Sequence, residues 1–352
     1  MAAAQPIIEN PAKPLSGNAG RIVTLKEEMR IEDTGGGFFF KNPYTIRVSP
    51  KGDIFIRDGQ EQALQFDPQG RFVRNLFKKG QGPGELTSLH DIWASKDRLF
   101  LMGFPPKILV YDFDGNLIKE ISARDSIDLI SQFVQADAEG LLIHTQGRLD
   151  PSAGSGLKDI PQNIIDITPD GVNSKPIGSF PIRGSVQVSS GGAIGMTTWN
   201  QLQTVPLDRN TIFLNYTPEY LVETFDREKG MVVRRFKRPY PRVKRSGGGG
   251  VSGPGGGSPP PSEFKPDINA LHVVDGKIWV QTSTVVAGKG ILFDVYDLEG
   301  RYLDNFFIQS LKKDPSNKPV NMRLTIAEGF AYFMDMTEDD LIVIKKCRLI
   351  GS

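Results

Sequence analysis

The sequence predicts an all-β fold: a six-bladed β-propeller closed by an N-terminal strand that completes the last blade. Three observations predict it. A turn motif recurs along the chain, a second turn leads into an alternating apolar strand in most repeats, and helix-length segments with a 3.6-residue apolar period are nearly absent.

The first recurring motif is an aromatic or apolar residue, an Asp or Thr, a short spacer and a Gly, followed by a short strand. Asp caps such a turn through its own backbone, and Gly accepts a positive φ, so the motif suits a connection between antiparallel strands. The copies lie at Phe66–Leu76, Tyr111–Ile121, Ile167–Phe180, Phe225–Phe236 and Tyr296–Phe307.

The second motif lies upstream of the first and is a turn followed by a strand of alternating apolar residues. Its copies are Ser49–Asp58, Ser95–Met102, Asp137–Thr145, Leu207–Tyr216, Val274–Thr282 and Ala327–Met336. Each repeat therefore reads as four short strands, which is one blade of a propeller.

The predicted blades begin near Tyr44, Leu89, Gln132, Trp199, Ile268 and Asn321. The last blade has room for only three strands. Arg21–Glu32 is the only strand-like segment before the first blade, so we expect it to supply the fourth strand and remove the free edges. This gives an exposed leader over residues 1–20 and one propeller domain over residues 21–350.

Composition excludes several classes of protein. Apolar residues make up 39% of the chain, which is too much for a disordered protein, and the net charge of +1 gives no global attraction to nucleic acid or anionic membranes. The single cysteine, Cys347, excludes an internal disulfide and a cysteine-based zinc site. No apolar run is long enough to span a bilayer.

The N-terminal residues are polar and proline-rich and lack the apolar core of a secretion signal. Either the protein is cytoplasmic, or a signal has been removed and Met1 added. Residues 246–262 are rich in Gly and Pro and predict a flexible surface loop, with a lid over the channel or a tether as the alternatives.

The segment "KKGQGPGELTSL" (Lys78–Leu89) combines three glycines and a proline between two strand-like stretches. A phosphate-binding loop of the Walker type requires Gly-Lys-Ser/Thr leading into a helix, and here a strand follows. The glycines supply unusual dihedrals and Pro83 stiffens the crossing, so the loop is predicted to link the outer strand of one blade to the inner strand of the next. Glu85 remains a candidate for a site at the channel mouth.

The runs "VSPKGDIFIRD" and "LQFDPQGRFVRNLFKKGQGPGELTSL" resemble the NHL repeat and, more closely, bacterial six-bladed propellers of undetermined function. In those proteins a Gly-x-Gly-Pro-Gly-Glu segment recurs between blades, and the resemblance covers roughly Ile22 to Leu349. Because those proteins are typically exported, it implies a periplasmic, secreted or lipid-anchored protein whose signal has been removed. A cytoplasmic location is the alternative.

Ligand sites of propellers usually lie at the central channel, on the face whose loops lead into the inner strands. On this chain we expect that face to bind a protein, a small molecule or a glycan. The candidate ligand-binding residues are Asn42, Arg47, Glu85, His90, Trp93, Trp199, Asn200, Asn269 and Arg323. The aromatic members could instead fill space between blades, and Phe38–Phe40 could either contact a partner or pack under the closing strand.

No cofactor is expected, with zinc and calcium as open alternatives. Zinc is suggested by six-bladed amidating lyases that bind it through three histidines, but His90, His144 and His272 do not occupy equivalent strand positions, which favours unrelated packing roles. Calcium is suggested by lactonase-like propellers. Its candidate ligands are Asn42, Glu85, Asp91, Asn200 and Asn269.

The stretch "RRFKRPYPRVKR" carries only basic charges, interleaved with Phe236 and Tyr240, and could bind a polyanion. The candidate anion-binding residues are Arg234, Arg235, Lys237, Arg238, Arg242, Lys244 and Arg245. A solvated outer strand is the competing interpretation, because the rest of the chain balances the charge. Nucleic acid is not an expected partner.

These patterns favour a monomeric, non-enzymatic propeller that binds a ligand on its loop-rich face. The alternative is a metal-dependent lyase or lactonase acting in the channel.

Overall fold

The computed structural model describes residues 6–33, 35, 37–123, 131–147, 152, 154–189, 194–198, 200–245, 263–309, 322–337 and 339–351. Trp199 and the Gly/Pro-rich segment 246–262 therefore lie outside the described residues. The described residues contain β-strands and no α-helix. Among them, no helix could cross a membrane.

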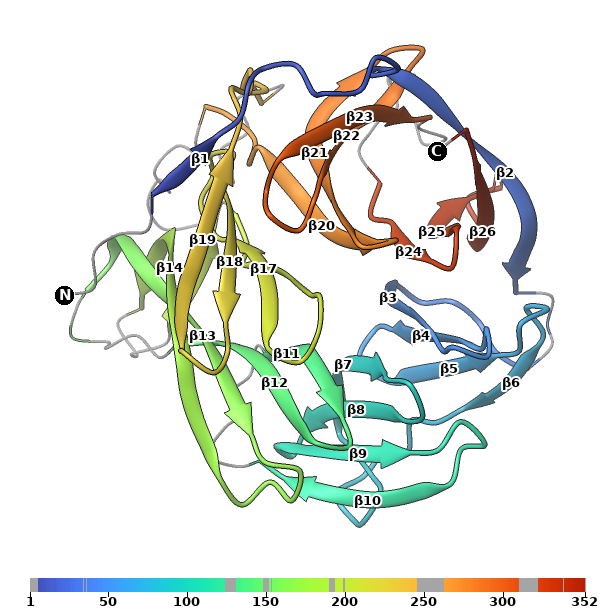
Figure 1. The fold of residues 1–352 in the computed structure, drawn as a ribbon. Helices are drawn as coiled ribbons and strands as arrows, with labels where there is room; N and C mark the ends of the chain where they lie inside the picture. Colours follow the sequence, from blue (N-terminus) through green and yellow to red (C-terminus); the bar gives the residue numbers. More distant parts are fainter. Residues whose placement is uncertain are drawn as a thin grey trace. The chain divides into compact units, whose positions relative to one another are not determined.

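The described strands follow one another in short antiparallel meanders (Figure 1). In chain order they are β1 (Ile7–Glu9), β2 (Arg21–Glu32), β3 (Pro43–Val48), β4 (Ile54–Asp58), β5 (Gln62–Phe66), β6 (Phe72–Asn75), β7 (Ser88–Ala94), β8 (Leu99–Phe104), β9 (Lys107–Tyr111), β10 (Leu117–Ser122), β11 (Ser131–Asp137), β12 (Gly140–Gln146), β13 (Gly156–Ile167), β14 (Ser174–Val188), β15 (Ile194–Thr198), β16 (Gln203–Pro206), β17 (Thr211–Asn215), β18 (Val222–Asp226), β19 (Met231–Lys237), β20 (Ile268–Val274), β21 (Lys277–Val286), β22 (Gly290–Tyr296), β23 (Tyr302–Ile308), β24 (Thr325–Ala327), β25 (Phe330–Met336) and β26 (Ile342–Ile350).

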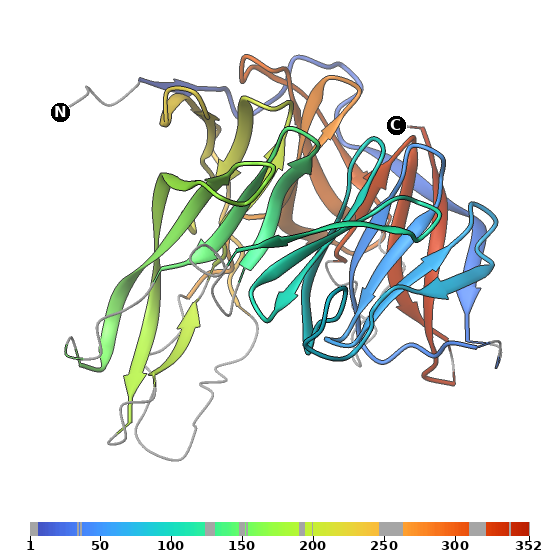
Figure 2. The ribbon, with the colours of Figure 1, turned by 90° about the horizontal axis from the view of Figure 1, so that it is seen from below.

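The meanders group into six blades, and the predicted fold class is confirmed. The strand orders in the described residues are β3-β4-β5-β6, β7-β8-β9-β10, β11-β12-β13-β14-β15, β16-β17-β18-β19-β1, and an eight-stranded sheet, β20-β21-β22-β23-β2-β26-β25-β24, which holds the last two blades. The inner strands are β3, β7, β11, β16, β20 and β24, which begin within a few residues of the predicted positions. Two blades have a fifth strand: β15 extends the third, next to the long hairpin of β13 and β14 (green in Figure 2), and β1 extends the fourth.

The predicted closing strand is also confirmed. From Thr24 onward, β2 runs antiparallel to β26 and so supplies the outer strand of the last blade. Its first residues, Arg21 to Val23, pair in parallel with β23 instead. Ile31 on β2 is 2% exposed and packs in a core formed by residues of the first and last blades, so the segment contributes apolar burial as well as backbone pairing.

The chain forms two compact units. Unit 1 holds residues 1–23, 146–163 and 178–321, and unit 2 holds residues 24–145, 164–177 and 322–352. Unit 2 therefore contains the first two blades, the inner strands β11 and β12 of the third, and the last blade. The single domain expected over residues 21–350 stays a prediction.

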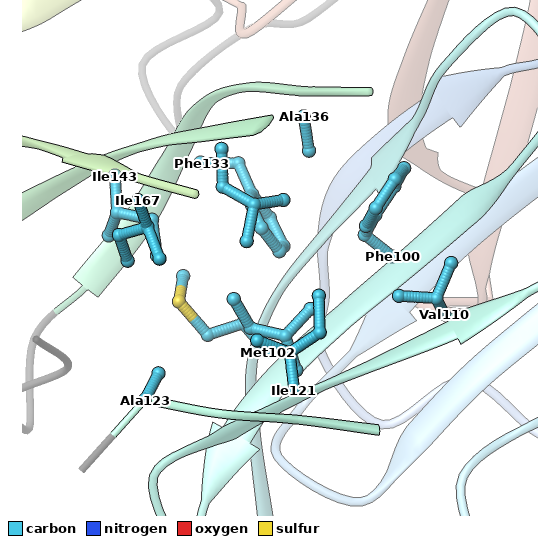
Figure 3. Packing of buried hydrophobic residues seen from close by; sticks show 11 residues of the cluster. Phe100, Met102, Val110, Ile121, Ala123, Phe133, Ala136, Ile143 and Ile167 are labelled. Carbon is cyan, nitrogen blue, oxygen red and sulfur yellow. The ribbon is translucent and has the colours of Figure 1, made fainter. Parts of the chain in front are cut away.

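Blades in unit 2 are held together by apolar side chains from neighbouring sheets. Figure 3 shows Phe100 and Met102, from β8, packed against Phe133 and Ile143, from β11 and β12. All four side chains are at most 5% exposed. Burial of such large side chains stabilises a fold by about 1.5–3 kcal/mol each.

The aromatic run after Gly37 divides between core and surface. Phe38 lies edge-on to Phe66 at 5.0 Å between ring centroids and to Phe40 at 5.2 Å, and both Phe38 and Phe40 pack against the core that includes Ile31 of the closing strand. Phe39 is 54% exposed. Packing therefore explains two of the three rings, and only Phe39 is available to a partner.

The N-terminal residues lie along unit 1 in an extended conformation. The side chains of β1 are exposed, as expected for a leader, but its backbone pairs in parallel with β19. The amide of Asn10 donates to the carbonyls of Lys237 and Gly300, and its oxygen accepts the N–H of Tyr302. The segment is thus anchored by its backbone and by one asparagine.

Candidate ligand-binding site

Several inner strands carry a β-bulge near their start, where two residues face one on the partner strand. The register shifts between Pro43 and Thr45 in β3 and between Leu89 and Asp91 in β7, which leaves Tyr44 and His90 as the extra residues. Bulges bend a strand and redirect a side chain, and they are frequent beside functional sites. In unit 1, Asn269 of β20 occupies the same kind of position.

Tyr44 lies beside two guanidinium groups. The Cζ atom of Arg323 is 4.5 Å from the centre of the Tyr44 ring, and that of Arg57, on β4, is 4.9 Å away. Tyr44 is 38% exposed and Arg323 is also exposed, whereas Arg57 is half-buried. Such cation–π contacts contribute about 0.5–1 kcal/mol each at exposed sites.

A second stack lies on the neighbouring strands of the same unit. The Cζ atom of Arg47, on β3, is 4.8 Å from the ring of Trp93, on β7. The Nε of Arg47 donates to the carbonyl of Ile92 at 3.2 Å, which fixes the guanidinium against the indole. Trp93 also packs on the apolar core between the second and third blades, so one side chain can both fill space between blades and line a ligand site.

Asp91 and His90 complete this group. Asp91 is 3% exposed, and its carboxylate accepts the N–H of Phe133 at 2.9 Å and the hydroxyl of Thr45 at 3.4 Å. The Nε2 of His90 lies 3.3 Å from the hydroxyl of Ser88, while its buried Nδ1 has no hydrogen-bond partner within the described part of the chain. We call Tyr44, Arg47, Arg57, His90, Asp91, Trp93 and Arg323 the arginine–aromatic cluster.

The electrostatics of the cluster are dominated by positive charge. Burial lowers the pKa of Arg47 and of Arg57, and Arg323 lowers both further, whereas Asp91 raises them. Burial, followed by the charge of Arg57, also lowers the pKa of His90, so this imidazole is neutral at pH 7. One carboxylate thus faces two of the three cations, Arg47 and Arg57.

Four members of the cluster, Arg47, His90, Trp93 and Arg323, were predicted as ligand-binding residues, and Asp91 was predicted only as a calcium ligand. Sequence reasoning missed Tyr44 and Arg57. Arg57 carried a signal, since it is a charged residue within the otherwise buried strand β4. Tyr44 carried none, because a bulge is not visible in the alternation of apolar residues.

Asn42 and Glu85 lie elsewhere in unit 2 and have local roles. The backbone N–H groups of Lys41 and Asn42 donate to the buried carboxylate of Asp58, whose pKa is raised by burial. The carboxylate of Glu85 accepts the N–H of Gly82 at 3.0 Å, within its own loop.

The loop that contains Glu85 is held by a buried lysine. Lys107 donates to the carbonyl of Gly82 at 2.8 Å and pairs with Glu120 at 3.1 Å, and Glu120 also accepts the N–H of Gly84. A Cβ at Gly80 would overlap the Glu85 carboxylate, so a larger residue there would displace this side chain from its present position. These contacts agree with the structural role predicted for the segment.

The remaining predicted ligand residues lie in unit 1 or outside the described residues. Asn200 is 7% exposed and donates to the carbonyl of Tyr216. Asn269 donates to the carbonyl of Thr282 at 3.4 Å and accepts the hydroxyl of Ser283 at 3.2 Å. Trp199 is not among the described residues.

The described residues contain no group of three or more His, Cys, Asp or Glu side chains suited to a metal ion. His90 and His144 belong to unit 2 and His272 to unit 1. Burial lowers the pKa of His272 to about 4, and its ring lies 6.0 Å from that of Phe293. The zinc and calcium alternatives stay hypotheses.

The basic stretch in and after β19 is tied into unit 1 by ion pairs. The pairs are Arg235–Glu223, Lys237–Glu9, Arg238–Asp294, Arg242–Asp267 and Lys244–Glu263. Arg234 and Arg245 donate to the carbonyls of Leu298 and Phe264. Much of the positive charge is therefore compensated within the chain, and the anion site on this stretch stays a prediction.

Comparison with known proteins supports the fold. A family described as a six-bladed β-propeller matches residues 33–156, a range that includes every member of the cluster except Arg323. No curated protein matches the sequence.

Two solved structures resemble the chain over most of its length. One is a Bacteroides fragilis protein whose name places it among exported proteins, with 12% identity, a TM-score of 0.49, and coverage of 98% of this chain and 99% of the other. The other is BamB from Moraxella catarrhalis, with 10% identity, a TM-score of 0.39, and coverage of 92% and 99%. Neither resemblance bears on function.

Proposed function

We propose that this propeller is a non-enzymatic binding protein of the NHL type that acts outside the cytoplasm as a single chain. Its ligand, a small molecule, a glycan or a protein segment, binds at the arginine–aromatic cluster of unit 2. The observation that carries the proposal is that the bulge in β3 places the Tyr44 ring beside Arg57 and Arg323. Arg47 stacks on Trp93 of the next blade, and none of these three arginines forms an ion pair with a carboxylate among the described residues. The location outside the cytoplasm rests on the sequence resemblance alone.

The side chains of the cluster favour binding over proton transfer. Arginine stays protonated at physiological pH, so Arg47, Arg57 and Arg323 supply hydrogen-bond donors and charge but no acid or base. The carboxylate of Asp91 is engaged with Phe133 and Thr45. His90 is the one group here that could exchange a proton near neutral pH, and its pKa is lowered.

A thermal-shift screen of the intact protein tests the proposal. The panel contains neutral and acidic mono- and oligosaccharides, amino acids and short peptides. A ligand that binds the folded state stabilises it by about 2.7 kcal/mol at a concentration 100-fold above its Kd. We expect at least one compound to raise the melting temperature of the wild type.

The same compound should not stabilise Tyr44→Ala, while Arg71→Gln should respond like the wild type. Arg71 is an exposed arginine of unit 2 whose side chain pairs with Asp67, away from the cluster. Chemical conversion of the bound compound, detected by mass spectrometry, would contradict the non-enzymatic assignment. Equal stabilisation of Tyr44→Ala would contradict the site.

The lyase or lactonase alternative depends on a metal. The metal content of protein purified without chelators or a histidine tag separates the two functions. About one zinc or calcium per chain that is lost in His90→Ala would favour the enzyme.

A further inference from the structure

We infer that the ligand presents an oxyanion group, a carboxylate or a sulfate, to Arg57 and Arg323, with Arg47 as a third cation. This inference rests on the proposed binding function and specifies the chemistry of its ligand.

The charge balance of the cluster is incomplete. Within the described residues, neither Arg47, Arg57 nor Arg323 forms an ion pair with a carboxylate. Arg47 and Arg57 are nevertheless partly buried. A cation removed from water without a partner is costly, so buried charges are normally paired.

The acidic residue nearest these cations cannot compensate all three. Asp91 faces Arg47 and Arg57, but one of its oxygens accepts the backbone N–H of Phe133 and the other accepts the hydroxyl of Thr45. His90 adds no negative charge and is kept neutral by its surroundings. An anion from outside the chain would supply the missing charge.

Two of the guanidinium groups lie beside the same aromatic ring and retain donors for such an anion. Arg57 and Arg323 contact the face of Tyr44, and a stacked guanidinium keeps its N–H edge free for a planar oxyanion. Arg57 uses only its Nε internally, donating to the carbonyl of Gly59 at 3.1 Å. No hydrogen bond of its terminal nitrogens is found within the described part of the chain. Paired N–H donors of this kind bind carboxylates and sulfates in a bidentate manner.

The basic stretch of unit 1 provides the contrast within the same chain. There Arg238 is buried against Asp294, and Arg235 and Arg242 also pair with carboxylates. Several arginines of unit 1 are thus paired with carboxylates, whereas the partly buried Arg47 and Arg57 of the cluster have no such pair among the described residues.

The experiment is a titration followed by NMR on the side-chain Nε–Hε resonances of Arg47 and Arg57 in the intact protein. The probes are sodium acetate for the carboxylate and sodium sulfate for the sulfate, and sodium chloride at equal ionic strength is the reference. We expect saturable shifts with acetate or sulfate, and the more effective of the two identifies the source of the oxyanion. Shifts no larger than those with chloride would overturn the inference.

Two variants locate the binding energy. Arg323→Gln leaves the Arg57 resonance as a reporter and should weaken binding about tenfold, as expected for loss of one charge-assisted contact of about 1.4 kcal/mol. Arg71→Gln removes the same charge elsewhere in unit 2 and should change affinity less than twofold. Unchanged affinity in folded Arg323→Gln would also overturn the inference.

The result separates failure of this inference from failure of the proposed function. If a neutral compound from the thermal-shift screen shifts the Arg57 resonance while acetate and sulfate do not, the proposed binding function holds. The assignment of an oxyanion group to the ligand is then wrong. If no compound and neither anion shifts it, both are wrong.

Discussion

Arg238 and Arg57 show two different uses of a partly buried cation in one chain. Burial opposes the charge of Arg238, but the Asp294 carboxylate outweighs that effect and raises the pKa of the guanidinium. Asp294 is fully buried and also accepts the hydroxyls of Tyr220 and Tyr302, at 2.8 and 2.7 Å. Arg57 has no such partner among the described residues, and burial lowers its pKa. The first arrangement is structural, and the second is the one that we propose as a binding site.

Loss of the carboxylate at the structural pair should be severe. We expect Asp294→Ala to lower the free energy of unfolding by about 3–5 kcal/mol, because Arg238 would remain buried without a counter-charge. Urea denaturation followed by circular dichroism measures the effect. Glu28→Ala removes the exposed pair with Arg348 and is the control, with an unfolding midpoint close to that of the wild type. Similar midpoints for the two variants would contradict the structural role of Asp294.

At the scale of the elements, the repeated turns and alternating strands were predictable from the sequence because their signals are local. A strand in which apolar and polar residues alternate, next to an Asp-x-x-Gly turn, specifies an antiparallel pair wherever it occurs. The bulges at Tyr44 and His90 were not predictable, since one extra residue changes the register of pairing without changing the composition of the strand. The pairing of residues 7–9 with β19 was also missed, because three exposed residues carry no periodic signal.

Two glycines of the fifth blade test how far strand pairing constrains the backbone. Gly276 and Gly290 both have a positive φ, at 68° and 108°. A Cβ at Gly276 would meet nothing within 4 Å, whereas a Cβ at Gly290 would overlap the carbonyl oxygen of Ile308 in the β22–β23 pair. Gly276→Ala should therefore cost only the dihedral penalty of about 1–2 kcal/mol.

Gly290→Ala should cost about 1–3 kcal/mol more, because the strand pair must separate to admit the methyl group. Chemical denaturation of the two variants side by side provides the measurement. An equal loss of stability would show that β22 and β23 tolerate separation at this point.

For the whole molecule, the blade count and the closing strand followed from the number of repeats, because the sixth repeat has too few strands to complete itself. The arginine–aromatic cluster could be predicted from the sequence only in part. Arg47, His90, Trp93 and Arg323 were predicted from their places on or before inner strands, but their grouping with Tyr44 and Arg57 depends on tertiary structure. The net charge of +1 conceals a local excess of positive charge at this group.

The central claim is that the ligand of this protein binds at the arginine–aromatic cluster. The most direct test is fluorine NMR of the protein labelled with 5-fluorotryptophan. The chain has three tryptophans, so at most three resonances are expected. The Trp93 resonance is assigned by its absence in Trp93→Phe. Because Trp93 lies 4.8 Å from the guanidinium of Arg47, we predict that a ligand which stabilises the protein shifts this resonance most and in a saturable manner. An unchanged Trp93 resonance at a ligand concentration that saturates the thermal stabilisation would contradict the account.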